Sequence, residues 1–411
     1  MKPRAMFEEE TGEPVRYKIR FPDEEAFEAA QAEETPLLAV PVQNDKRQFI
    51  SVQARPVVAR GRQAELPSMD ELLRVYETEF GAEIVEDRRY DLERFDLEIV
   101  DEIEGEPSLD DVLHAIGAPQ AWRASRGAGV TIAIVDTGID GSRPEFPQAK
   151  RRDHWAPVGE NAWQDYHGHG TMAACIAAAT RVDGGEFDGV APDATLISCR
   201  THFFDSELTS IYDFLGDLTS HGEPLIASNS FGIKSADPPE LRPADDFPNA
   251  LAEAIEKGLL VCFSAGNNHE LVGGAADACE PTSIWAYKCR DDVLTVAASR
   301  LDRTMWSYSS RGPGQHHGEP GMAQKPDVAA PSPPNGRILW GGSPRSFPIG
   351  WGTSGSCPQA AGLLALLAAA RPAGRDDLFQ AVRSSARSLG LGANCQGTGQ
   401  LDCEKALQQH V

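Results

Sequence analysis

The sequence predicts an α/β protein with a parallel sheet and helices on both of its faces, preceded by a small α+β domain. Beyond residue 116, apolar strand-like runs alternate with helix-like segments to the end of the chain, an order typical of parallel sheets. Before residue 100, about four short strand patterns and two helix patterns follow one another instead, which predicts a small α+β sandwich.

The distribution of charge supports this division. The 411 residues carry a net charge of -24, and residues 1–110 hold 14 basic against 28 acidic side chains, which leaves -14 there and -10 in the remainder. A step of this kind indicates units with different roles. We expect an acidic tail over 1–14, the α+β domain over 15–100, an acidic linker over 101–115 and the α/β domain over 116–411.

Local patterns predict the elements of the N-terminal domain. Val15–Phe21 alternates apolar and polar residues like a half-buried strand, and Asp23–Ala32 reads as a helix capped by Asp23. A second helix over Pro67–Phe80 begins with a capping box made of Ser68 and Glu71. Further strands are expected at residues 37–42, 48–52, 83–85 and 95–100.

Three polar residues at the ends of predicted elements carry the chemistry of the α/β domain. Asp136 ends the apolar strand pattern Val130–Val135, and the carboxyl end of such a strand is where open α/β sheets place ligands. His169, in His-Gly-Thr, and Ser354, in Gly-Thr-Ser, each open a helix pattern. A helix N-terminus favours negative charge that develops on a nucleophile.

These residues supply the orienter, base and nucleophile of a serine hydrolase, in the order Asp, His, Ser that subtilisin uses. On these motifs, residues 108–411 resemble the subtilisin-like serine proteases, the subtilases. The resemblance implies a subtilisin-like sheet, and it selects His169 over His167 and Ser354 over Ser356. It also implies that Asn267, which follows an apolar strand ending in Ala-Gly, donates a side-chain N–H to the oxyanion.

The resemblance extends to neighbouring segments. The N-terminal domain resembles the ferredoxin-like propeptide of subtilases, and Ala82–Asp87 resembles the Val-Glu-x-Asp segment that closes many propeptides. Gly355 departs from the family, which usually has Met after the nucleophile, and we expect it to loosen the turn or open space beside the pocket. Cys357 lacks a base set against it and is not expected to act as a nucleophile.

The resemblance also implies a substrate site, in which the peptide adds as a strand along Ser230-Phe231-Gly232. Phe231 is expected to form one wall of the primary specificity pocket. The remaining walls are expected to come from Ser264, Ala265, Gly266 and Asn268. These small neutral walls favour an uncharged residue before the scissile bond, whereas the acidic insertion over 233–248 could attract basic substrates.

No cofactor is expected to be required, and no metal site is assigned, although calcium is possible. The loop over 180–189 takes the place of a family calcium loop and offers Asp183, Glu186 and Asp188, but it is longer and its ligands do not match. The pair His316-His317 lacks the other ligands of a metal site.

Charge and the distribution of apolar residues limit the classes of partner and the cellular compartment that we expect. The acidic chain argues against nucleic acid and anionic membranes as partners. No apolar stretch follows the basic residues at the N-terminus and no run reaches 18 apolar residues, so we expect a cytoplasmic protein. Its eight cysteines are then expected to be free thiols, with Cys279/Cys289 and Cys395/Cys403 as the near pairs if disulfides form.

The sequence therefore predicts a serine endopeptidase that is made as a zymogen. Its N-terminal domain is expected to act as an intramolecular inhibitor or chaperone, with cleavage between Tyr90 and Pro107. Two alternatives stay open: a regulated protease that keeps this domain and matures one peptide or protein partner, and a non-catalytic peptide-binding scaffold.

Overall fold

A computed structural model describes most of the chain, which divides into two compact units. The described residues are 15–31, 38–54, 69–92, 100–101, 107–219, 222–239, 242–315, 323–332, 338–340, 343–346 and 351–410. The acidic tail, Ser68, residues 95–99 and His316-His317 lie outside them. The first unit ends at Arg88 and includes Pro157–Gly159 and Phe204–Ser206, and the second begins at Arg89.

The N-terminal unit is a two-helix, four-stranded α+β structure. Its elements are β1 (Arg16–Arg20), α1 (Glu24–Gln31), β2 (Leu38–Asn44), β3 (Phe49–Ala54), α2 (Met69–Phe80) and β4 (Glu83–Glu86). The strands pair antiparallel in the order β2-β3-β1-β4, and this element order is that of ferredoxin-like folds. The Asp23 carboxylate accepts from the backbone N–H of Ala26 at 2.9 Å, as expected of a helix cap.

Buried polar groups accompany the apolar core of this unit. Lys18 and Asp205, each 1% exposed, form an ion pair at 2.6 Å. The Asp87 carboxylate accepts from the hydroxyls of Ser51 and Ser206 at 2.7 and 2.6 Å and from the Ser206 N–H at 3.0 Å. Burial, partly offset by these bonds, raises the pKa of Asp87 to about 6.

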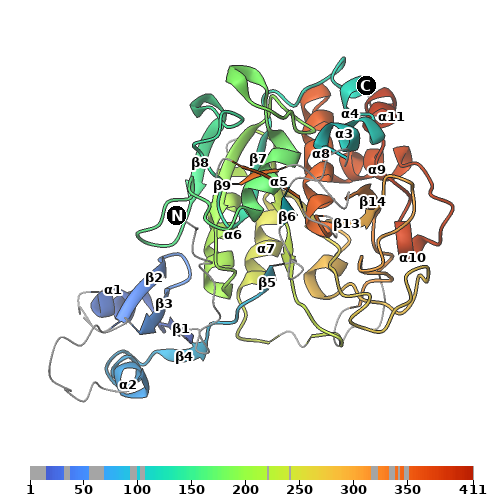
Figure 1. The fold of residues 1–411 in the computed structure, drawn as a ribbon. Coiled ribbons are helices and arrows are strands. Elements are labelled where there is room, and N and C mark those ends of the chain that lie inside the picture. Colours follow the sequence, from blue (N-terminus) through green and yellow to red (C-terminus); the bar gives the residue numbers. More distant parts are fainter. Residues whose placement is uncertain are drawn as a thin grey trace. The chain divides into compact units, whose positions relative to one another are not determined.

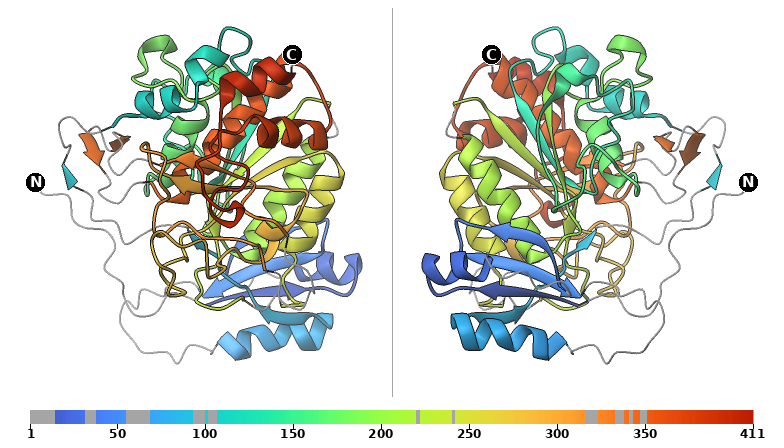
Figure 2. Two further views of the ribbon diagram at one scale, coloured as in Figure 1. Left: turned by 90° about the vertical axis from the view of Figure 1, so that its right-hand side faces the viewer. Right: turned by 90° about the vertical axis from the view of Figure 1, so that its left-hand side faces the viewer.

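The second unit contains a seven-stranded, fully parallel sheet, which confirms the predicted fold class. Its strands are β7 (Thr131–Asp136), β8 (Arg151–Trp155), β9 (Thr195–Arg200), β10 (Leu225–Asn229), β12 (Leu260–Ser264), β13 (Leu294–Ser299) and β14 (Val328–Pro331). They lie in the order β14-β13-β12-β10-β7-β9-β8. Figures 1 and 2 show them as a central layer of this unit with helices on either side.

Alternation along the strands explains the two layers of helices. In β7, Ile132 and Ile134 join the core formed with α5 (His169–Ala178) and α8 (Cys357–Ala370). Ala133 and Val135, which point to the opposite face, join the core formed with α6 (Asp205–Thr219) and α7 (Phe247–Glu256). Because both faces are buried, the strand reads as a continuous apolar run. The remaining helices of this unit are α3 (Leu109–Ala115), α4 (Ala118–Ala121), α9 (Arg375–Ser385), α10 (Ala393–Gln396) and α11 (Cys403–His410).

The expected linker over 101–115 is structured in its second half. There, Ser108 and Asp111 form a capping box for α3, and Leu109, Val112 and Leu113 are buried in the core of the second unit. This helix was not predicted, because the stretch before Pro107 is acidic and the apolar spacing that defines the helix begins only at Leu109.

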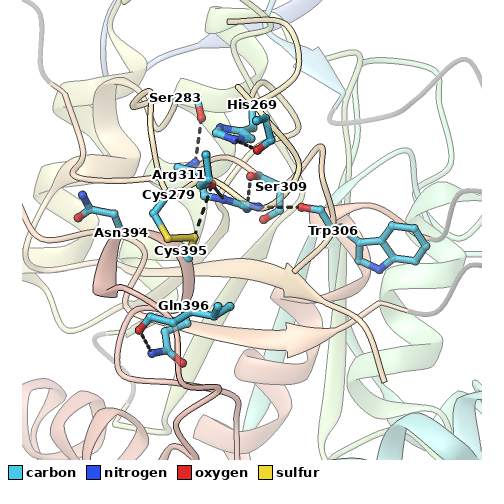
Figure 3. The surroundings of a disulfide bond; sticks show 12 residues. His269, Cys279, Ser283, Trp306, Ser309, Arg311, Asn394, Cys395 and Gln396 are labelled. Carbon is cyan, nitrogen blue, oxygen red and sulfur yellow. Dashed lines mark hydrogen bonds between the residues drawn. A yellow bond between two sulfur atoms is a disulfide. The ribbon is translucent and has the colours of Figure 1, made fainter. Parts of the chain in front are cut away.

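The cysteines differ from the expectation of eight free thiols. Cys279 and Cys395 form a disulfide across 116 residues, with their Cα atoms 5.0 Å apart, so neither near pair in the sequence is joined. Figure 3 shows it beside Arg311, whose fully buried guanidinium donates to the carbonyls of Ala278, Ser309 and Trp306. The other six cysteines are free and buried.

Candidate active site

The end of β7 and the start of α5 bring a carboxylate and an imidazole together. Nδ1 of His169 lies 2.8 and 2.9 Å from the two carboxylate oxygens of Asp136. The two side chains are only 7% and 1% exposed. Asp136 also accepts from the backbone N–H of Thr137 at 2.8 Å. The carboxylate thus fixes the ring orientation and favours the tautomer that carries its proton on Nδ1.

The other ring nitrogen of His169 is available for chemistry. Nε2 is buried and has no hydrogen-bond partner among the residues that the structure describes. The first helical turn that carries Ser354, the 3-10 helix η4 (Thr353–Gly355), packs against α5. An imidazole held at Nδ1, with Nε2 left without a partner among the described residues, is suited to accept a proton.

Asn267 is anchored beside the turn that carries Ser354. Its side-chain oxygen accepts from the backbone N–H and the hydroxyl of Thr353 at 3.1 and 3.0 Å. The Thr353 hydroxyl in turn accepts from the N–H of Gly266 at 3.2 Å. Because the oxygen is used as the acceptor, the Asn267 amide nitrogen is the end that can donate to an oxyanion.

The residue after Ser354 does not open space in the site, contrary to expectation. A Cβ on Gly355 would lie 2.6 Å from the Cβ of Trp351 and 3.1 Å from the Ser332 hydroxyl. Trp351 is 3% exposed, and its carbonyl accepts from the Gly355 N–H at 3.0 Å. The indole therefore fills the volume beside the nucleophile turn.

The neighbouring candidates have structural surroundings. The Ser356 hydroxyl donates to the Ala330 carbonyl at 2.9 Å, as expected of a packing serine. Cys357 is fully buried, and burial raises the pKa of its thiol to about 11, which disfavours a thiolate. The ring of His167 lies 6.2 Å from that of His169, and its backbone N–H donates to the Asp165 carboxylate at 3.0 Å.

Asp165 is a functional candidate that the sequence analysis missed. Its carboxylate accepts hydrogen bonds from Thr137 at the end of β7 and from the backbone around the start of α5. The signal in the sequence is an acidic residue four positions before His169, in a loop where acidic residues are common. Nothing in its type or spacing alone separates it from a solvated side chain.

The predicted substrate segment pairs with the chain's own strand. β11 (Phe231–Gly232) lies antiparallel to β5 (Asp91–Leu92), with Phe231 opposite Leu92 and Gly232 opposite Asp91. The preceding residue, Tyr90, is 2% exposed, and its N–H donates to the Phe203 carbonyl at 2.8 Å. Residues 90–92 therefore bond to two different segments of the second unit.

Phe231 contacts an aromatic cluster rather than an open pocket wall. Its ring lies 5.6–6.4 Å from those of Tyr90, Phe203, Phe247, Phe263 and Tyr287, and the residue is fully buried. The adjacent Ser230 hydroxyl donates to the Ser354 carbonyl at 3.3 Å. The segment Ser230–Gly232 thus connects the nucleophile turn with the surroundings of Tyr90.

The other predicted pocket residues continue β12 toward Asn267. Ser264 and Ala265 are buried, and Gly266 has φ of 106°, a conformation that favours glycine. Asn268, 2% exposed, donates to the Ile233 carbonyl at 3.2 Å. In the acidic insertion, Asp245 is paired with Arg242 at 2.9 Å, so its charge is compensated within the segment.

Two carboxylates at the loop over 180–189, those of Glu145 and Asp188, lie beside arginine side chains. The fully buried Glu145, which accepts from the Glu186 N–H at 2.8 Å, is paired with the Arg143 guanidinium at 3.1 Å. Asp188 lies 3.6 Å from Arg181 and 3.8 Å from Arg126. Guanidinium groups at these carboxylates supply the positive charge that an ion would bring. Within the described ranges, no group of three or more acidic, His or Cys side chains is arranged to hold a metal.

Comparison with known sequences identifies a matching family and several similar proteins. The sequence profile of the subtilase family matches residues 127–397. The chain is 29% identical to an intracellular serine protease of Paenibacillus polymyxa over 61% of its own length and 70% of that protein. It is 26% identical to thermitase of Thermoactinomyces vulgaris over 71% of its length and 94% of that protein.

Solved structures support the fold. Fervidolysin from Fervidobacterium pennivorans, a keratinolytic enzyme related to subtilisin, superposes with a TM-score of 0.60 at 18% identity. The alignment covers 98% of this chain and 62% of that one. MycP1 with its N-terminal propeptide removed gives 0.55 at 22% identity, over 73% of this chain and 97% of that one. In the part of the chain that the structure describes, no helix has the length and hydrophobicity needed to cross a bilayer.

Proposed function

The chain belongs to the subtilase family of serine endopeptidases, and we propose that Ser354 is its nucleophile, His169 its general base and Asp136 the residue that orients the base. The observation that carries this assignment is the buried pair of Asp136 and His169, at 2.8 and 2.9 Å, packed beside the turn of Ser354. All three side chains come from the end of a strand or the first turn of a helix in one α/β unit.

In this mechanism, Nε2 of His169 removes the proton from the Ser354 hydroxyl as its oxygen attacks the peptide carbonyl. Asp136 stabilises the imidazolium that forms. The negative charge on the carbonyl oxygen is stabilised by the Ser354 N–H and the Asn267 amide. His169 then protonates the leaving amine, and water hydrolyses the acyl-enzyme by the same route in reverse.

The assignment is tested by labelling with a fluorophosphonate and by hydrolysis of a fluorogenic peptide. We expect one adduct per wild-type chain and none on Ser354→Ala or His169→Ala. Asn267→Ala should still be labelled but lose about 10²–10³-fold in kcat, the range that loss of such a donor causes in subtilisin. Peptide hydrolysis that survives in Ser354→Ala would overturn the proposal.

We further propose that the segment of Tyr90 and β5 keeps the enzyme latent, so that the N-terminal domain acts as an intramolecular inhibitor. In support, β5 pairs with β11, which lies in the segment that the family resemblance expects to bind the substrate peptide. The buried ring of Tyr90 packs against those of Phe231, Phe247 and Tyr287. An extended peptide that adds to a sheet edge gains main-chain bonds and side-chain pockets. β5 makes both kinds of contact and therefore competes with a substrate peptide.

Intact mass after fluorophosphonate treatment separates the two forms of this proposal. A wild-type chain shortened near Tyr90–Pro107 and carrying an adduct indicates a self-maturing zymogen. A full-length chain with an adduct indicates the regulated processing protease that keeps its N-terminal domain. A full-length Ser354→Ala chain is the control for self-cleavage.

The contribution of Tyr90 can be measured on the uncut chain. Tyr90→Ala removes the enclosed ring, so we expect the fluorophosphonate to label full-length protein at least about tenfold faster. Tyr90→Phe keeps the ring and should behave like wild type. Equal labelling rates for the two variants would count against inhibition by this segment.

A further inference from the structure

We propose that Asp165 is a positioning residue for the catalytic pair: its carboxylate holds the residue after Asp136 and the helical turn of His169 in one fixed relation. This proposal rests on the function proposed above, because it concerns the same site. It is carried by a set of five hydrogen bonds that converge on one partly buried carboxylate.

One oxygen of Asp165 connects the two elements of the site. Oδ1 accepts from the Thr137 hydroxyl at 3.0 Å, which belongs to the residue directly after Asp136. The same oxygen accepts from the backbone N–H groups of His167 and Gly168, at 3.0 and 2.7 Å, directly before His169. Asp136 and His169 are therefore tied through Asp165 as well as to each other.

The second oxygen fixes the first turn of α5. Oδ2 accepts from the backbone N–H and the hydroxyl of Thr171 at 2.9 and 2.7 Å. Helix α5 begins after Gly168, which has no side chain to cap the helix. Asp165 supplies the acceptor that an N-cap side chain would otherwise provide, so it determines how this turn presents His169.

The two hydroxyls leave no freedom to reverse these bonds. The Thr171 hydroxyl, while donating to Asp165, accepts from the Asp140 N–H at 2.9 Å. The Thr137 hydroxyl, while donating to Asp165, accepts from the Gly170 N–H at 3.0 Å. All five groups around Asp165 are thus donors, an arrangement that only a carboxylate, which accepts at both oxygens, can satisfy.

Substitution by asparagine breaks this pattern without changing the size of the side chain. An amide placed there turns its NH₂ group toward donors on one side, so at least one pair of hydrogen bonds becomes a repulsive contact. The loop and the helical turn must then shift apart, and a displacement of about 1 Å at a catalytic group can reduce the rate about 10²-fold.

The test compares Asp165→Asn with the matched pair Thr171→Val and Thr171→Ser. Serine keeps the hydroxyl that donates to Asp165, and valine keeps the shape but removes it. We expect Asp165→Asn and Thr171→Val to lower kcat by about tenfold or more, with KM within about twofold. Thr171→Ser should retain most of the wild-type kcat. Thermal unfolding on the Ser354→Ala background records how much of each effect is stability.

A second measurement does not depend on activity. In protein with isotope-labelled histidine, the Nδ1 proton of His169 bonded to Asp136 gives a far-downfield resonance. We expect this resonance in Ser354→Ala and in its combination with Thr171→Ser, and its shift or loss in the combinations with Thr171→Val and Asp165→Asn. An unchanged resonance and unchanged kcat, with only a lower melting temperature, would reduce Asp165 to a helix cap and overturn the proposal. If the wild type has no peptidase activity but the variants show the expected pattern of resonances, the proposed function is overturned and the positioning role is supported.

Discussion

Trp351 and Gly355 are complementary in shape: the indole occupies the volume into which any side chain on residue 355 would have to project. The contact that forbids a larger residue is made by the Cβ of Trp351, 2.6 Å from the position of an added Cβ. A Cβ cannot rotate away, and the Trp351 backbone is held by its bond to the Gly355 N–H. The glycine after the nucleophile is therefore a requirement of the packing here.

Gly355→Ala should destabilise the protein and reduce catalysis. The overpacked methyl group must displace Trp351 or the turn of Ser354, at a cost of about 1–3 kcal/mol, and the displaced nucleophile should lower kcat. Gly374→Ala is the matched control, because nothing lies within 4 Å of its added Cβ. Thermal unfolding on the Ser354→Ala background and kcat on the active protein are the measurements. Equal behaviour of the two alanine variants would show that Trp351 yields without strain.

Chelators should leave the stability of the protein unchanged, because arginine side chains pair with Glu145 and Asp188 at the loop over 180–189. EDTA is expected not to shift the melting temperature. Arg143→Gln, in contrast, leaves Glu145 buried without its counter-charge and should cost about 3–5 kcal/mol. Arg181→Gln breaks a more exposed pair and should cost less than about 1 kcal/mol. A melting temperature that falls with EDTA and recovers with calcium would contradict this account.

Asp87 should make the N-terminal unit less stable as the pH rises from about 4 to about 6. Its pKa is raised from 3.8 to about 6 in the folded unit, so over this range the folded form keeps a proton that the unfolded form loses. Two units of pKa correspond to at most about 3 kcal/mol, lost in full above pH 6. Hydrogen exchange of β1 and β3, corrected for the intrinsic rate, measures this change.

The matched variants for this prediction are Asp87→Asn and Asp45→Asn. The first removes the titrating group and should flatten the pH dependence of exchange. The second removes an exposed carboxylate of the same unit and should preserve that dependence. A slope that survives in Asp87→Asn would assign the effect to another group.

Alkylation with iodoacetamide should count the cysteines in two classes. Under native conditions without reductant we expect no adducts, because six thiols are buried and the other two cysteines are joined. In denaturant without reductant, the intact mass should show six adducts, and after reduction with a dithiol it should show eight. Loss of this crosslink, which closes a loop of 116 residues, should cost about 3–5 kcal/mol. Eight adducts in denaturant without reductant would exclude the disulfide.

The sequence predicted those features that depend on neighbouring residues. The apolar run before Asp136 and the helix pattern after His169 define their elements locally. The C-terminal end of β7 and the first residue of α5 could therefore be placed. The partner of Cys279 could not, because Cys395 becomes its neighbour only through the fold. Asp165 was missed for a related reason: its five donors lie in the bend after β7, in the loop before α5 and in α5 itself, and no periodicity marks them.

The pairing of β5 with β11 has a consequence for how the enzyme would be used. A strand attached to the same chain competes at an effective concentration that is commonly millimolar for a short connection. A peptide at micromolar concentration would rarely displace it, whatever the intrinsic rate of the catalytic groups. Cutting the chain beyond Leu92 turns the same strand into a separate molecule, whose inhibition weakens on dilution. The activity per molecule would then depend on how concentrated the protein is after cleavage.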